Sequence, residues 1–247
     1  MKRSETIKVV VVNHSTTITD EDAAAGVAAM QKQVSEDFAP VWNIDATLQF
    51  AGKDRLRTSL PDHWALVLVD DRTQSDELGY HDVTSSGLPL ATIQVSLVPA
   101  GHDWTHTASH ELLEMLADPT ADLAVYSRPD EATRRIYAHE VCDPCAAYED
   151  GYTVAGRRVA DFVFPTWFHG ATGQASSGGR FDERGLIKAP LEVRPGGYIG
   201  VLDPATFTWS IEGTGSESAP DGAGESRLQL RTTARTGRQL SDMDWIP

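Results

Sequence analysis

Residues 106–119 read HTASHELLEMLADP and carry the clearest chemical pattern in the chain. A helix is predicted over Thr105 to Leu116, and Asp118-Pro119 is expected to stop it, because proline and the residue before it leave helical geometry. On that helix His110 and Glu114 lie four residues apart and project from one face, with Cβ atoms about 5–6 Å apart. This spacing allows an imidazole and a carboxylate to bind the same metal ion.

Glu111 lies one residue further round this helix, where its carboxylate can act on a water beside the metal rather than on the metal. The arrangement is that of the HExxH helix of zinc peptidases with the second histidine replaced by glutamate, an HExxE pattern. The same pattern occurs by chance in half-exposed helices, so other features must support a site. Three leucines are predicted to face the core and hold the helix rigid: Leu112, Leu113 and Leu116.

The segments before this helix are predicted to be strand, helix, strand, strand and strand. That first helix has one apolar face and is expected to end near Pro40. The strands are predicted at residues 6–12, 44–50, 64–69 and 91–98. His81-Asp82 lies in a polar loop before the last of them and is interpreted as a turn. This order predicts a mixed β-sheet with helices packed on it, an α+β fold.

The pattern is less regular after residue 120. A hairpin followed by an aromatic loop is predicted over residues 152–168, and two strands over 197–209. We expect one domain over residues 1–212, with an N-terminal sheet and helix part (1–120) and an irregular, β-rich C-terminal part (121–212). Residues 213–247 are Gly-, Ser- and charge-rich and are predicted to form a polar, flexible tail.

A second cluster of ligand-type residues, HEVCDPC, occupies positions 139–145. It contains the only two cysteines, Cys142 and Cys145. Three interpretations of this pair remain open: a redox or local disulfide, metal ligands, and two buried thiols. Packing of buried thiols is preferred, because a structural zinc site would need two more ligands and no second CxxC is present.

Taken together, these segments resemble the zincin metallopeptidases over roughly residues 5–170. The specific resemblance is to zincin-like proteins that have an HExxE helix ending in Asp-Pro, followed by a Glu-x-x-Asp-x-Cys segment, here residues 140–145. It implies that His110 and Glu114 are metal ligands, that Glu140 is the third ligand, and that Glu111 is the general base. In that fold the strand before the active-site helix, here 91–98, is an edge strand that binds peptide.

The ligand set remains open in several respects. Glu114 replaces the usual histidine of zincins. His106 is another contender, but residues 106, 110 and 114 span about 12 Å on a straight helix, so all three cannot reach one ion. Asp143 and His139 are alternative ligands or partners that orient a ligand. Zn²⁺ is the expected cofactor, and the oxygen ligands leave Mn²⁺, Fe²⁺ and Ca²⁺ open.

The resemblance implies a metal-dependent hydrolase, a metalloprotease acting on peptide or amide bonds. One histidine and two carboxylates cancel the charge of the ion, so activity would depend strongly on Glu111 and on an oxyanion stabiliser. The sequence does not choose among the candidates for that stabiliser: His169, Tyr148, Tyr152 and Arg180. Two alternatives are a zincin-fold enzyme that tailors a small molecule, and a non-catalytic binding protein stabilised by its ion.

Charge and hydropathy limit the partners. Lys and Arg total 21 against 36 Asp and Glu, a formal net charge of -15. Such an acidic chain is a poor match for nucleic acid or an anionic membrane surface. The resemblance to zincins implies a peptide or small-molecule substrate. The start, MKRSETIKVVVV, has too short an apolar run for a signal peptide, and no stretch is long enough to span a membrane. A cytoplasmic protein is therefore predicted.

Overall fold

The computed structural model describes residues 6–52, 62–70, 77–127, 135–172 and 179–213. These residues form two units, each described by itself below. The first unit runs to Pro119 and also takes in Thr153–Val159. The second unit consists of Thr120–Tyr152 and the described residues from Ala160 onward.

The first unit is built on a five-stranded sheet in the order β2-β1-β3-β5-β4. Four strands pair in parallel: β1 (Ile7–Asn13), β2 (Ala46–Phe50), β3 (Trp64–Val69) and β5 (Pro89–Gln94). The short strand β4 (Gly79–Val83) pairs antiparallel with β5 and forms one edge. Four consecutive valines of β1 are buried, which is typical of a central parallel strand covered on both faces.

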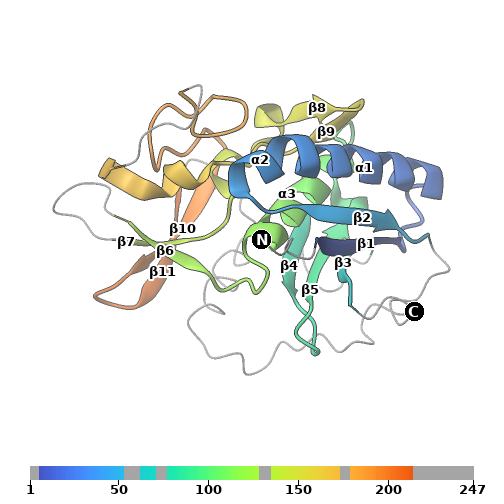
Figure 1. The fold of residues 1–247 in the computed structure, drawn as a ribbon, viewed down its shortest axis with the longest axis horizontal. Coiled ribbons are helices and arrows are strands. Elements are labelled where there is room, and N and C mark those ends of the chain that lie inside the picture. The colour runs from blue at the N-terminus through green and yellow to red at the C-terminus, as the bar shows by residue number, and fades with distance from the viewer. Residues whose placement is uncertain (1–5, 53–61, 71–76, 128–134, 173–178, 214–247) are drawn as a thin grey trace. The chain divides into compact units, whose positions relative to one another are not determined.

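The helix α1 (Asp20–Gln33) connects β1 to β2 and runs alongside β2 (Figure 1). Thr19 caps it by accepting a hydrogen bond from the Asp22 amide at 3.1 Å. The helical path then continues through a π-helical segment, Val34–Phe38, into α2 (Ala39–Trp42). The helical path ends at Trp42, close to the expected end near Pro40, and Pro40 itself lies in the first turn of α2, where proline is tolerated.

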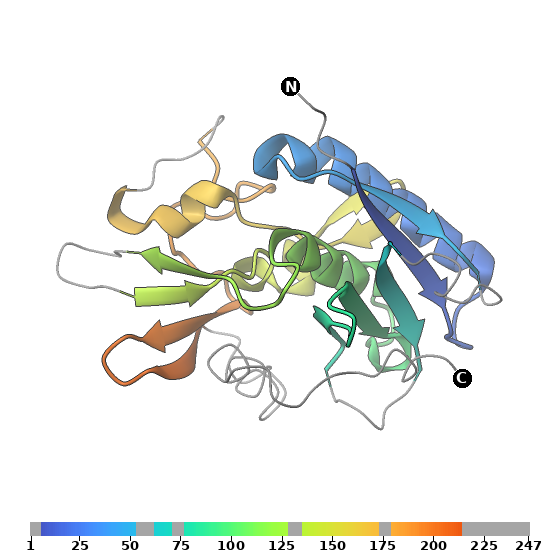
Figure 2. The same cartoon turned by 60° about the horizontal axis from the view of Figure 1, so that its bottom comes forward.

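The helix α3 (Trp104–Ala117) packs on β4 and β5, as Figure 2 shows. It also contacts α1 closely: a Cβ placed on Gly26 would lie 2.5 Å from the Trp104 ring, so only glycine fits there. Asp103 caps the helix by accepting a hydrogen bond from the Thr105 amide. The cap and the first turn of α3 are thus held by tertiary contacts as well as by local geometry.

A short hairpin, β8 (Tyr152–Val154) and β9 (Arg157–Val159), fixes this end of α3. The Arg157 guanidinium binds Asp103 at 2.8 Å and Asp22 at 2.6 Å, and it lies over the Trp104 ring, 5.4 Å from its centroid. Because one arginine joins the cap of α3 to the first turn of α1, both helix ends are tied to the same point.

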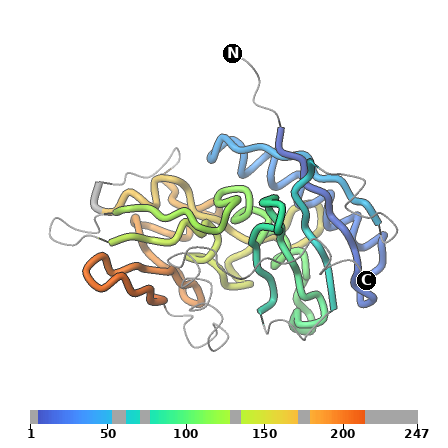
Figure 3. Tube along the Cα trace, turned by 90° about the horizontal axis from the view of Figure 1, so that it is seen from below, coloured from blue at the N-terminus to red at the C-terminus, as the bar shows by residue number. Residues whose placement is uncertain are grey.

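The second unit contains a four-stranded antiparallel sheet in the order β11-β10-β7-β6 (Figure 3). Its strands are β6 (Ala124–Ser127), β7 (Arg135–Ala138), β10 (Tyr198–Asp203) and β11 (Thr208–Gly213). Short 3₁₀ turns lie at Asp143–Cys145, Tyr148–Asp150 and Pro165–Thr172. The core of this unit is aromatic and includes Phe162, Phe164 and Trp167.

The predicted mixed α+β class is confirmed. The predicted strands at 6–12, 44–50 and 64–69, the helix over 105–116, the hairpin after residue 152 and the strand pair after 197 are all present within a few residues. Residues 214–247 of the predicted tail lie outside the described residues. In the described part of the chain, no helix combines the length and the apolar character that crossing a membrane requires.

Two expectations for the sheets are wrong. The strand at 91–98 was expected at the sheet edge, but β5 ends at Gln94, a 3₁₀ turn occupies Val95–Leu97, and β4 covers its outer side. The sequence GYHDV of β4 is polar enough to resemble a loop, which is why it was not predicted. Strands β6 and β7 were also missed, because each is only four residues long.

Candidate metal centre

The HELLE segment lies in the middle of α3, with its apolar residues in the core. Leu112 and Leu113 are fully buried, which confirms the predicted core face. Glu111 and Glu114 are also buried, with 4% and 2% of their surface exposed. Two carboxylates are therefore held on a rigid, largely desolvated part of the helix, where charged groups require compensating partners.

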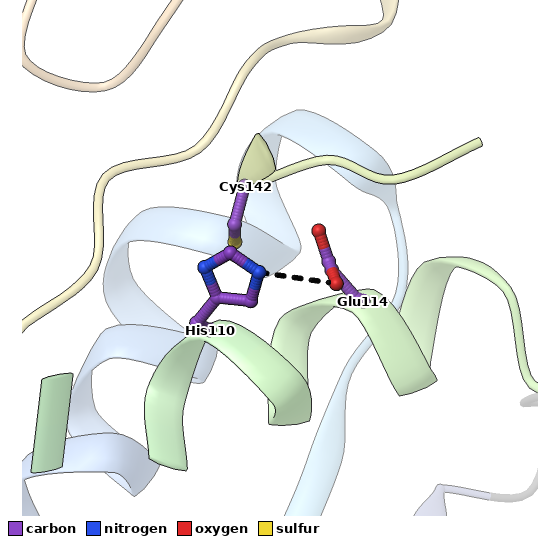
Figure 4. A group of neighbouring side chains, drawn as sticks. All are labelled: His110, Glu114 and Cys142. Carbon is purple, nitrogen blue, oxygen red and sulfur yellow. Dashed lines mark ion pairs between the residues drawn. The ribbon is translucent and has the colours of Figure 1, made fainter. Parts of the chain in front are cut away.

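His110 and Glu114 meet as the spacing predicted. The His110 Nε2 atom lies 3.2 Å from Glu114 Oε2, and 12% of the His110 side chain is exposed (Figure 4). Both side chains leave the same face of α3, one turn apart. Cys142, also drawn in Figure 4, belongs to the second unit and is described with it below.

His81 on β4 faces the same carboxylates. Its Nδ1 atom lies 3.4 Å from Glu111 Oε2 and 3.9 Å from Glu114 Oε2, and its side chain is fully buried. Alternation along β4 buries Gly79, His81 and Val83 and leaves the residues between them partly exposed. His81, Glu111 and Glu114 offer ligand atoms within 4.8 Å of one another and form a group that could hold a metal ion.

Gly79 makes room for the Glu111 side chain. A Cβ at this position would lie 2.7 Å from Glu111 Cγ and 3.0 Å from Thr107 Cγ2, closer than real Cβ contacts allow. Strand β4 can therefore approach α3 closely enough to bring His81 to the carboxylates only because residue 79 has no side chain.

His106 lies one turn before His110 and is buried, with 7% of its surface exposed. Burial, reinforced by the nearby His110 and Arg158, lowers the pKa of His106 from 6.5 to about 3. It is therefore a neutral imidazole at ordinary pH. Among the described residues, the groups of possible metal ligands in α3 include His110, Glu111 and Glu114 and do not include His106.

The HEVCDPC cluster lies in the second unit. Glu140 follows β7 and is half-buried, and Asp143 opens a 3₁₀ turn. The ring of His139 packs against Phe168, with centroids 5.0 Å apart. The assignment of Glu140, Asp143 or His139 as a further ligand stays a prediction. The four candidate oxyanion stabilisers also belong to this unit.

Cys142 and Cys145 are fully buried and form no disulfide with each other. Burial, together with four surrounding aspartates, raises the pKa of the Cys145 thiol well above its usual value. Such a thiol stays protonated and has little reactivity toward oxidants or electrophiles. This weighs against a redox role for Cys145, and the choice between packing and metal binding for the pair stays a prediction.

The sequence analysis missed His81 as a possible ligand. The available signal was the alternation in GYHDV, which puts Gly79, His81 and Val83 on one face of a strand. That signal is weak without the pairing to β5, which gives the segment its extended form.

Comparison of the chain with protein-family models, with curated proteins and with solved structures finds no match. The resemblance to zincins therefore rests on the residues alone, and the chemistry of this site must be argued from its own donor atoms. His81, Glu111 and Glu114, brought together where α3 packs on β4, form a group that could hold a metal ion, and His110 lies 3.2 Å from Glu114.

Proposed function

We propose that the first unit is the metal-binding part of a zincin-like hydrolase that cleaves peptide or amide bonds. The observation that carries this proposal is the His110–Glu114 pair, 3.2 Å apart on the buried HELLE turn with Glu111 beside it. An i, i+4 pair of ligand atoms next to a buried carboxylate suits metal-assisted hydrolysis better than a role in packing.

The separation of the two donor atoms fits a shared ion. Ligand atoms about 2.0–2.1 Å from a tetrahedral zinc ion lie about 3.3–3.4 Å from each other. His110 Nε2 and Glu114 Oε2 are within about 0.2 Å of that spacing. We therefore assign these two residues as ligands, with Zn²⁺ as the expected ion and Mn²⁺ or Fe²⁺ as alternatives that carboxylate ligands favour.

In this proposal Glu111 is the general base. Its carboxylate lies on the next position of the same helical turn and is almost fully buried, so it can take a proton from a water placed between it and the substrate carbonyl. The bound cation would supply Lewis acidity toward that carbonyl. Leu112 and Leu113 hold the turn in place, so that the carboxylate is oriented before substrate arrives.

The first test is elemental analysis of the purified protein and of two variants. We expect about one tightly held equivalent of a transition metal, lost in His110→Ala and retained in His102→Ala. His102 is an exposed residue just before α3 and serves as the matched histidine control. No metal in the wild type after incubation with Zn²⁺, Mn²⁺ or Fe²⁺ would contradict the proposal.

The second test is turnover of a library of peptides and amides by the wild type and by Glu111→Gln. We expect this variant to keep its metal and to lose about 10²- to 10⁴-fold in rate, the usual contribution of a general base. Undiminished turnover by Glu111→Gln would contradict the mechanism. Metal binding without turnover of any member of the library would favour a non-catalytic binding protein.

A further inference from the structure

Two imidazoles lie near one oxygen of the Glu114 carboxylate. Glu114 Oε2 is 3.2 Å from His110 Nε2 and 3.9 Å from His81 Nδ1. The two histidines come from different elements, α3 and β4, so two separate parts of the chain converge on one carboxylate. A carboxylate that has a ligand nitrogen from each of two elements nearby can bridge two ions.

His81 and Glu111 supply a second set of ligand atoms near the Glu114 carboxylate. We call the position among these three residues the inner position, and the position beside His110 and Glu114 the outer position. His81 Nδ1 is 3.4 Å from Glu111 Oε2, and both atoms lie within 4.8 Å of a Glu114 oxygen. Around an octahedral ion with ligand distances of about 2.1 Å, neighbouring ligands are about 3 Å apart and opposite ligands about 4.2 Å apart. The inner separations of 3.4 and 3.9 Å fall between these limits.

We propose that the first unit has a second cation position, held by His81, Glu111 and Glu114, with Glu114 shared between the two ions. This inner position takes a divalent transition metal that accepts mixed nitrogen and oxygen ligands, such as Mn²⁺ or Zn²⁺. The inference rests on the proposed function for the outer ion at His110 and Glu114, and it adds a second ion to that site.

Charge predicts that the two positions fill in sequence. A neutral imidazole and two carboxylates supply two negative charges, which balance one divalent ion. When the outer ion is bound to Glu114, it already neutralises part of the negative charge of the inner site. The two cations also repel each other. The inner ion should therefore bind more weakly than the outer one.

Filling the inner position changes the role of Glu111. A carboxylate that coordinates an ion has its electron pair engaged and becomes a poorer proton acceptor. If Glu111 is the general base, the second ion lowers turnover while the first supports it. Activity should then rise and fall as the metal concentration increases.

The experiment is a titration of the metal-free protein with Mn²⁺. Calorimetry measures the number of bound equivalents, and electron paramagnetic resonance records the spectrum at each step. The wild type should bind two equivalents in two steps, and the second should produce the broadened spectrum of a spin-coupled manganese pair. His81→Gln should bind one equivalent with an uncoupled spectrum. The exposed control His102→Ala should behave as the wild type does.

The outcomes separate this inference from the function on which it rests. One equivalent in the wild type, lost in His110→Ala and unchanged in His81→Gln, would overturn the inner position and leave the outer site intact. No bound equivalent would contradict the proposed function itself. The wild-type stoichiometry and spectrum decide the matter even if His81→Gln fails to fold.

Discussion

Each unit of the molecule buries carboxyl groups, but the two units neutralise them differently. In the first unit Glu111 and Glu114 face the imidazoles of His81 and His110. In the second unit Asp161 and Asp182, both fully buried, accept hydrogen bonds from nearby backbone amides. Burial of charge is therefore common to both units, and the identity of the partner separates a ligand set from a structural pair.

The second unit shows the structural solution in detail. Asp182 accepts from the amides of Leu186 and Ile187, and Asp161 from those of Phe162 and Arg184. Burial first, and then the neighbouring Asp182, raise the pKa of Asp161 well above its usual value. A proton held by Asp161 removes one of the two negative charges. In the first unit, by our proposal, a metal ion has that role.

The largest expected effect comes from removing the carboxylate near the two imidazoles. Glu114→Ala should abolish binding of both ions, because this residue contributes to both ligand sets. Asp161→Asn, which also neutralises a buried carboxyl, should leave metal binding unchanged. Dialysis against metal followed by elemental analysis measures both. If the two variants lost metal equally, the distinction between the two carboxyl groups would fail.

A smaller effect is expected at Gly79. A Cβ there would lie 2.7 Å from Glu111 Cγ, so Gly79→Ala must push the Glu111 side chain or move β4 away from α3. Overpacking of this kind costs about 1–3 kcal/mol of unfolding free energy. The Gly79→Ala variant should also bind the second equivalent of Mn²⁺ more weakly.

Gly26→Ala is the matched control for this variant. Its Cβ would lie 2.5 Å from the Trp104 ring, so it should destabilise the protein as well, but the clash lies away from the carboxylates. Chemical denaturation and manganese titration of both variants test this pair. If Gly26→Ala also lost the second manganese equivalent, the effect at Gly79 would not be local.

Asp103→Ala should destabilise the N-terminal end of α3 without changing the proposed metal ligands. Asp103 caps the helix and accepts from Arg157 and from the Arg158 amide, at 2.8 and 3.1 Å. Loss of a cap costs about 0.5–2 kcal/mol. We expect a lower unfolding free energy in urea with the metal stoichiometry unchanged. A fully stable variant would show that Arg157 and Asp22 hold the helix end without the cap.

The smallest effect is expected at Asp161 and depends on pH. The pKa of Asp161 in the folded protein is raised above its usual value of 3.8, so the folded state keeps its proton where the unfolded state releases it. The stability of the protonated pair is fully present below pH 3.8 and declines as pH rises through the folded pKa.

Asp161→Asn should remove this dependence, because the amide stays neutral at every pH. The free energy of unfolding of this variant, relative to that of the wild type, should therefore increase as pH rises. Denaturation curves at a series of pH values measure the difference. A constant difference between the two proteins would mean that Asp161 does not retain a proton in the folded state.

The sequence predicts the parts of the molecule whose signals are local. The buried strand β1 follows from its run of valines, and the helix α3 from its leucines and the Asp-Pro stop. The His110–Glu114 contact follows from helical geometry alone, since residues four apart share a face. For this reason the outer half of the candidate site could be predicted.

The inner half could not, because it depends on pairing between distant segments. His81 reaches Glu111 only because β4 pairs with β5 and Gly79 permits the close approach to α3. Neither the pairing with β5 nor the packing against α3 can be inferred from the short polar segment that contains His81. The strands β6 and β7 were missed for a related reason, since tertiary contacts outweigh weak local patterns.

The central claim is that α3 carries a metal ion on His110 and Glu114. Crystals of the protein grown with Zn²⁺ and measured on both sides of the zinc absorption edge test it most directly. We predict an anomalous difference peak about 2.0–2.2 Å from His110 Nε2 and a Glu114 carboxylate oxygen. An ordered HELLE helix with no peak beside these two atoms would contradict the account.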